Sequence, residues 1–117
     1  MSNSSDKFIS VKISKELKGD FETFCARCGM TVSGAVSLLV SETLEENRLP
    51  FEITEKAIKR YENSIAGLDY QSGSIRVRID PETRKEFANV CKSIGIPQGR
   101  IVKMFMLNCL DNGKLPF

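Results

Sequence analysis

Two arginines and a lysine in this chain alternate with apolar residues, in a pattern that suits contact with another molecule. Residues 74 to 80 read Ser-Ile-Arg-Val-Arg-Ile-Asp, and residues 9 to 14 read Ile-Ser-Val-Lys-Ile-Ser. Successive side chains of a β-strand point to opposite faces, so each stretch predicts a strand with one apolar and one polar face. Arg76 and Arg78 can each donate two hydrogen bonds to O6 and N7 of a guanine, and Lys12 can do so less rigidly. The polar faces are therefore candidate surfaces for reading DNA.

Each of these strands leads directly into a predicted helix. Asp80 is a favourable N-cap because its carboxylate can accept hydrogen bonds from the first free N–H groups of a helix. Pro81 is tolerated at the first helical position, where its missing N–H would have had no partner. Ser14 stands at the corresponding place after the first strand. We therefore expect two strand-to-helix junctions, each completed within one residue.

The two stretches belong to an internal duplication with an offset of 66 residues and no gap. Of the 43 positions from 9 to 51, 12 carry the same residue 66 positions later. The period is longer than that of solenoid repeats, so two copies of a small strand-helix-helix unit are expected. The identical positions are Ile9/Ile75, Val11/Val77, Ile13/Ile79, Glu16/Glu82, Phe21/Phe87, Cys25/Cys91, Gly29/Gly95, Val36/Val102, Leu44/Leu110, Leu49/Leu115, Pro50/Pro116 and Phe51/Phe117.

Within each copy, apolar residues recur at spacings of three and four over two further segments, which predicts two helices. The first helix covers residues 15 to 28. Gly29 and Gly95 are placed to end this helix and its counterpart, because glycine readily takes a positive φ. The second helix, from about residue 31 to residue 46, is apolar around most of its girth, as is its counterpart. A helix of this kind needs cover on several sides, so the two copies are expected to fold together.

Composition narrows the classes of function. The chain has 117 residues and a net charge of only +2, so any contact with nucleic acid is expected on one face. It contains no histidine, and neither a Gly-rich phosphate loop nor a nucleophile-base set is present in the sequence. We therefore expect no enzymatic activity, no metal and no cofactor. No apolar run is long enough to span a bilayer and no signal-peptide core is present, which predicts a cytoplasmic protein without a membrane partner.

The four cysteines include a C-x-x-C spacing, Cys25 and Cys28, that would suit zinc or a redox pair. The duplication argues against both, because Cys25 matches Cys91 whereas Cys28 matches an isoleucine. Cysteines without a partner usually behave as small buried apolar residues. We therefore expect these residues, and Cys109, to lie in the core without disulfides.

The chain divides into four segments. Residues 1–7 are polar and predicted to be disordered, and residues 8–51 form the first copy. Residues 52–73 are expected to be a linker with a helix over residues 54–66, where apolar and charged residues fall on opposite sides. Residues 74–117 form the second copy, and the two copies are expected to form one folding unit.

An ordered set of motifs occurs in both copies: an alternating strand, a capped helix, a glycine, a largely apolar helix and a Leu-Pro-Phe triplet. Clear examples are Ile-Arg-Val-Arg-Ile-Asp-Pro-Glu at residues 75–82 and Gly-Met-Thr-Val-Ser at residues 29–33. The set resembles the ribbon-helix-helix fold of DNA-binding proteins, in particular the RelB/DinJ antitoxin branch, over residues 9–51 and 75–117. The resemblance implies a mainly α fold with a two-stranded antiparallel β-ribbon, one strand from each copy. Because one chain carries both copies, it also implies an intramolecular pseudo-dimer, as in relaxosome accessory proteins with tandem units.

The same resemblance implies which residues meet DNA. The ribbon would enter the major groove, and the free N–H groups at the start of each second helix would hold a phosphate. The two strands differ, so the DNA site is expected to be asymmetric, with the more demanding half under the second strand. Pro97 removes one N–H donor in the second copy, so anchoring is expected to be weaker there. The predicted base-contacting residues are Ser10, Lys12, Ser74, Arg76 and Arg78, and the predicted phosphate-contacting residues are Thr31, Val32, Ser33, Gln98, Gly99 and Arg100.

Several alternatives are left open by the sequence. In one alternative, the charged side chains of the ribbon only keep an exposed sheet face hydrated and bind no DNA. In another, Thr31 and Pro97 only mark the beginnings of helices. The leading prediction is a sequence-specific double-stranded DNA-binding protein that represses transcription. The alternatives are an antitoxin that binds a toxin through the segment after residue 51, and a relaxosome accessory protein in conjugative transfer. The predicted partners are accordingly double-stranded DNA, a toxin or a relaxosome protein, and the chain can also associate with itself on DNA. The two strands can pair within one chain or between two chains that exchange copies.

Overall fold

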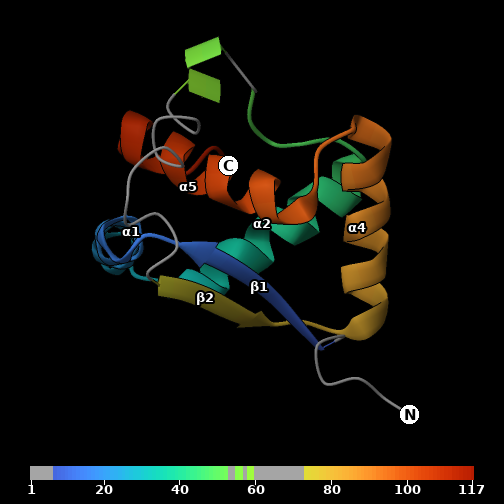
Figure 1. The fold of residues 1–117 in the computed structure, drawn as a ribbon, viewed down its shortest axis with the longest axis horizontal. Helices are drawn as coiled ribbons and strands as arrows, with labels where there is room; N and C mark the ends of the chain where they lie inside the picture. The colour runs from blue at the N-terminus through green and yellow to red at the C-terminus, as the bar shows by residue number, and fades with distance from the viewer. Residues whose placement is uncertain (1–6, 53–54, 57, 60–72) are drawn as a thin grey trace.

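A computed structural model describes residues 7–52, 55–56, 58–59 and 73–117 of the chain (Figure 1). It is mainly helical, with one two-stranded antiparallel sheet in the described part, and the predicted fold class is confirmed. The strand-helix-helix order occurs twice. The elements are β1 (Phe8–Ile13), α1 (Lys15–Arg27), α2 (Val32–Glu46), β2 (Gly73–Arg78), α4 (Pro81–Ile94) and α5 (Gln98–Asn112).

The strands β1 and β2 pair with each other as an antiparallel ribbon. Their register sets Ser10 opposite Arg76, and these two residues are related by the 66-residue offset of the duplication. The register therefore relates the two strands by a pseudo-twofold axis that passes through this pair. A further hydrogen bond of 2.8 Å, from the N–H of Ile79 to the carbonyl oxygen of Lys7, extends the ladder at one end. In this structure the ribbon forms within one chain.

Helices α1 and α4 begin where the sequence predicts, because a side chain caps each of them. Ser14 Oγ accepts a hydrogen bond of 3.0 Å from the N–H of Leu17. Asp80 Oδ2 accepts two hydrogen bonds of 3.2 Å, from the N–H groups of Glu82 and Thr83. Each cap satisfies backbone donors that have no partner inside the helix, and so fixes the point at which strand becomes helix.

The ends of α1 and α4 also agree with the prediction. Gly29, just after α1, has a φ of 75°, and Gly95, just after α4, has a φ of 91°. Only glycine takes this left-handed conformation without a steric cost from a Cβ atom. The turn that follows each helix then directs the chain into α2 and α5.

One hydrophobic core contains residues of both copies. Each second helix lies against the strand and the first helix of the other copy, since α2 contacts β2 and α4 while α5 contacts β1 and α1. In Figure 1 the ribbon runs along one side of the molecule, with α5 above it and α4 at one end. The ring of Phe105 in α5 lies among the rings of Phe21, Phe51 and Phe117, with centroid distances of 6.0, 6.1 and 5.8 Å. The core is therefore shared between the copies.

The prediction that the cysteines lie in the core is correct for Cys25, Cys91 and Cys109 and wrong for Cys28. Cys28 is the C-cap residue of α1, and its side chain is exposed. Its counterpart Ile94, at the end of α4, is also 39 % exposed. The physical reason is that the core covers the middle of each first helix and does not reach the last residue of its apolar face.

Two predicted segments fall largely outside the described residues. Of residues 1–7, only Lys7 is described. The helix predicted over residues 54–66 coincides with described residues only at 55–56 and 58–59, which are helical, and its other positions lie outside the described part.

Candidate nucleic-acid interface

The five predicted base-contacting residues lie together on one face of the ribbon. All five side chains are exposed, whereas Ile9, Val11, Ile13, Ile75 and Val77 on the opposite face are buried in the core. The alternation that separates the two faces follows from the period of two in a strand. The structure thus presents three cations and two serines on one exposed surface, consisting of Ser10, Lys12, Ser74, Arg76 and Arg78.

The cross-strand pairs on this face differ from one end of the ribbon to the other. Arg78 is opposite Phe8 at one end, Arg76 is opposite Ser10 at the centre, and Lys12 is opposite Ser74 at the other end. The guanidinium group of Arg76 stacks on the ring of Phe8, with Arg76 Cζ 3.9 Å from the ring centroid. Phe8 is the first residue of β1 and was not among the predicted base-contacting residues. An aromatic residue on the same strand face as Ser10 and Lys12, two positions before Ser10, was the available signal for a contact with an arginine.

Arg84 of α4 is not on the ribbon but forms a hydrogen bond to its first residue. Its Nε donates a hydrogen bond of 2.9 Å to the carbonyl oxygen of Phe8, and the contact is partly buried. The bond ties the beginning of β1 to α4. Arg84 and its counterpart Lys18 are both basic. Charge alone does not reveal a bond between residues so far apart in the chain.

The predicted phosphate-contacting residues occupy the first turns of α2 and α5. In α2, Thr31 is the N-cap, and its Oγ1 accepts a hydrogen bond of 3.0 Å from the N–H of Gly34. Thr31 and Ser33 are exposed and Val32 is half-buried. Helix geometry leaves the N–H groups of Val32 and Ser33 without a partner inside the helix, and the helix dipole adds partial positive charge there. This end of α2 can therefore accept an anion.

The first turn of α5 differs in its cap. Pro97 occupies the N-cap position and makes no side-chain capping hydrogen bond. The N–H groups of Gln98 and Gly99 follow it in the first turn, where helix geometry provides no acceptor. Gln98 and Gly99 are half-buried and Arg100 is exposed. The beginnings of α2 and α5 thus both supply N–H donors. A side chain caps α2, whereas none caps α5.

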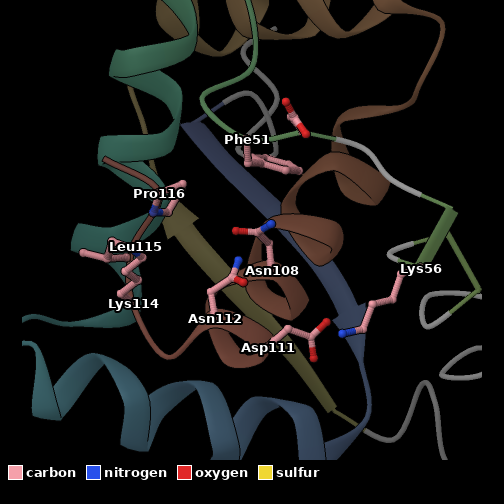
Figure 2. Close-up of a pocket in the computed structure, with 9 residues that line it drawn as sticks. Phe51, Lys56, Asn108, Asp111, Asn112, Lys114, Leu115 and Pro116 are labelled. Atoms are coloured by element: carbon pink, nitrogen blue, oxygen red, sulfur yellow. The ribbon is translucent and has the colours of Figure 1, made fainter.

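A separate hollow of about 430 Å³ lies at the C-terminal end of α5 (Figure 2). Figure 2 shows the amino group of Lys56 and the carboxylate of Asp111 pointing towards one another at its edge. The lining mixes both signs of charge with amides and apolar groups, which favours no particular class of ligand. No motif in the sequence indicates this hollow. Its lining residues are Phe51, Glu52, Lys56, Asn108, Asp111, Asn112, Lys114, Leu115 and Pro116.

Cys25, Cys91 and Cys109 are buried, and their surroundings disfavour the thiolate. Burial raises the pKa of the Cys25 thiol to about 11 and that of the Cys91 thiol to about 11. Burial raises the pKa of Cys109 further, to about 12. A thiol that keeps its proton at neutral pH is a poor nucleophile and a poor metal ligand. All four cysteines are free, and the described residues contain no group of three or more His, Cys, Asp or Glu side chains that could hold a metal ion.

No single helix in the described residues is long and apolar enough to cross a membrane. Helices α1 and α2 reach the necessary length and apolar character only when taken as a pair, and they are bent by 82° relative to each other. Much of α2 is buried in the core, so core packing accounts for its apolar character.

Comparison with known proteins gives one family. A family model described as RelB antitoxin matches residues 6–66 and 72–117, which together make up most of the chain. Searches of curated proteins and of solved structures each found no match. The match includes both strands, the helices α1, α2, α4 and α5, and residues 52–66 after the first copy. The chain therefore belongs to the RelB antitoxin family.

Proposed function

We propose that this chain binds double-stranded DNA in a sequence-specific manner and acts as a transcriptional repressor. The observation that carries the proposal is the exposed ribbon face, on which Lys12, Arg76 and Arg78 lie together while the opposite face is buried. Three cationic side chains lie on one narrow surface, although the net charge of the whole chain is only +2. Membership of the RelB antitoxin family, which is a non-enzymatic regulatory family, supports a regulatory role.

The proposed mechanism places the ribbon in the major groove. This groove is about 12 Å wide and admits a two-stranded ribbon, with each base pair presenting a distinct pattern of donors and acceptors. Arg76 and Arg78 would each bind O6 and N7 of a guanine, and Lys12 would bind one of these acceptors. Ser10 and Ser74 would act as less selective donors or acceptors.

Backbone groups at the helix starts would hold the DNA backbone. The first turns of α2 and α5 each offer N–H groups that helix geometry leaves without an acceptor, at Val32 and Ser33 and at Gln98 and Gly99, together with a dipole that favours an anion. Contacts of this kind fix the position of the ribbon in the groove without reading sequence. They also make binding depend on salt, because each neutralised phosphate releases counterions.

The test compares two double variants of the full chain. Arg76→Ala with Arg78→Ala removes both guanidinium groups from the ribbon, and Lys85→Ala with Lys92→Ala removes the same charge from exposed positions of α4. Each bidentate arginine–guanine contact contributes about 1–3 kcal/mol of discrimination, so the ribbon variant should lose at least about 30-fold in affinity for its preferred duplex. The α4 variant should lose far less.

Binding is measured with duplexes from the chain's own upstream region, at two salt concentrations. Wild-type affinity should fall steeply as salt rises. If the ribbon variant keeps the affinity and sequence preference of the wild type, the ribbon mechanism is refuted. Light scattering on the same complexes gives the number of chains on each duplex and so tests self-association on DNA.

A second candidate function is the neutralisation of a toxin. The observation that favours it is the extent of the family match, which continues past the end of the first copy to residue 66. In the RelB branch the segment after a DNA-binding unit contacts the toxin, so residues 52–66 are the part of this chain to test. Co-expression with the product of an adjacent small reading frame, followed by purification, should give a stable complex if this function is present. Absence of a complex, with DNA binding intact, would leave repression as the function.

A further inference from the structure

The ring of Phe8 fixes the direction in which Arg76 points. Phe8 is paired across the ribbon with Arg78, and Arg76 is paired with Ser10. The guanidinium group of Arg76 nevertheless lies over the Phe8 ring, 3.9 Å from its centroid. Arg76 therefore leans diagonally across the ribbon, away from its own partner and towards the end that carries Arg78. The guanidinium group of Arg76 thus lies on the same side of the ribbon's centre as residue Arg78.

The opposite end of the ribbon has a different character. The pseudo-twofold axis exchanges Phe8 with Ser74 and Arg78 with Lys12. The end equivalent to the Phe8–Arg78 pair is thus a serine paired with a lysine. A ribbon made of two identical strands would present the same groups at both ends. This ribbon presents two arginines and a ring at one end, and one lysine and one serine at the other.

Hydrogen bonds hold the backbone at Phe8, whose ring lies under the Arg76 guanidinium group. Its carbonyl oxygen accepts the 2.9 Å hydrogen bond from Arg84 Nε, and its side chain is half-buried. The neighbouring hydrogen bond from the N–H of Ile79 to the carbonyl oxygen of Lys7 closes the ladder at the same end. The backbone that carries the ring is therefore held by α4 and by the end of β2.

Stacking leaves the arginine able to bind a base. A guanidinium group that lies on a ring has its flat face covered, while its N–H donors point outwards from its edges. The stack also restricts a long side chain before DNA arrives, so less conformational freedom is lost on binding. Arg76 is in this way oriented in advance towards one half of the ribbon.

We propose that Phe8 is a positioning residue for DNA recognition, which holds Arg76 so that both arginines read the same half of the DNA site. This inference rests on the proposed function and deepens it. The chain binds its site in one orientation, with two guanine-containing base pairs close together in one half. The other half, under Lys12 and Ser74, tolerates substitution. Lysine and serine define the base less strictly than a bidentate arginine does.

The test selects preferred sequences from a pool of randomised duplexes, using the full chain and three variants. Phe8→Leu keeps apolar bulk but has no ring, Phe8→Tyr keeps the ring, and Lys85→Ala alters an exposed position of α4 away from the ribbon face. The wild type should select an asymmetric site with two guanines in one half. Phe8→Leu should reduce discrimination at the guanine nearer the centre by about twofold to fivefold, the range expected for an exposed cation–π contact, and spare the outer guanine. Phe8→Tyr and Lys85→Ala should retain the wild-type preference.

A measurement without DNA examines the stack itself. The ring current of Phe8 should shift the NMR signal of the Arg76 Hε proton in the wild type and in Phe8→Tyr, and the shift should vanish in Phe8→Leu. The same spectra show whether each variant is folded. A palindromic selected site, or an unchanged preference in Phe8→Leu, would overturn the inference while DNA binding stands. A wild type that selects no sequence would overturn the proposed function and this inference with it.

Discussion

Replacing Phe105 with alanine should destabilise both copies at once. Phe105 is fully buried in α5, and its ring lies among those of Phe21 of the first copy, Phe51 at the end of that copy, and Phe117. Loss of a buried phenylalanine costs about 3–5 kcal/mol, and each aromatic pair adds about 0.5–1.5 kcal/mol that is not independent of this burial. We expect a loss of about 4 kcal/mol. A domain of this size is stable by about 5–15 kcal/mol, so a large part of the total would be removed.

The assay is urea unfolding of the full chain, followed by far-UV circular dichroism and by NMR signals from each copy. The amide signals of Val36 in α2 and Val102 in α5 occupy equivalent positions, since they are related by the offset of the duplication. Both should disappear at the same urea concentration in the wild type and in Phe105→Ala. Leu38→Ala is the matched control, because Leu38 is 38 % exposed on α2, and it should cost less than about 1 kcal/mol.

Two results would refute this reasoning. Survival of the Val36 signal at urea concentrations where the Val102 signal has gone would show that the copies unfold independently. A loss below about 1.5 kcal/mol in Phe105→Ala would show that the ring does not fill the shared core as described.

Three further predictions concern local structure. Asp80→Ala should cost about 1–2 kcal/mol and Ser14→Ala about 0.5–1 kcal/mol in thermal unfolding, because Asp80 caps two backbone N–H groups and Ser14 caps one; an equal cost would contradict the capping geometry. Gly19→Ala should raise stability by about 0.5–1 kcal/mol, since a Cβ there meets nothing within 4 Å, whereas Gly95→Ala should lower it by about 1–2 kcal/mol because of the φ of 91°. Burial raises the pKa of Cys109 from 9.0 to about 12, so the unfolded chain loses this proton first, and the stability present below pH 9 should decline as pH rises towards 12. In urea titrations, the free energy of unfolding should fall less for Cys109→Ala than for the wild type between pH 8 and pH 10.5. An equal fall would show that the Cys109 thiol does not cause the pH dependence.

Much of the fold was predictable because the signals are local. The alternation of residues 74–80 sorts side chains onto two faces through the geometry of a single strand. The caps at Ser14 and Asp80 depend on bonds that span at most three residues. Gly29 and Gly95 mark helix ends because of the conformation of one residue each. The candidate DNA-contacting face was therefore predictable residue by residue, apart from Phe8 and Arg84.

The errors and omissions share one physical cause, which is that burial depends on neighbours far away in the chain. Cys28 falls on the apolar face of α1 by spacing, but the core does not extend to the end of that helix. Lys103 is 8 % exposed in α5, although a lysine in a helix is usually expected at the surface, and its counterpart Ser37 in α2 is exposed. Helices α2 and α5 have similar apolar patterns, but their equivalent positions are buried to different extents. The pattern alone does not reveal this difference.

By itself, the sequence determined which segments form strands and helices, which side of each strand is polar, and that the unit occurs twice. These properties follow from backbone geometry, capping and periodicity, all of which act over a few residues. Only the tertiary structure decided the register of the ribbon, because a slip by two residues would keep the same faces polar and apolar while changing every cross-strand pair. That register sets Ser10 opposite Arg76 and brings Phe8 next to the arginine. The difference in sequence between the two strands makes the candidate DNA-binding surface asymmetric, and the long-range pairing decides which residues face one another at each end.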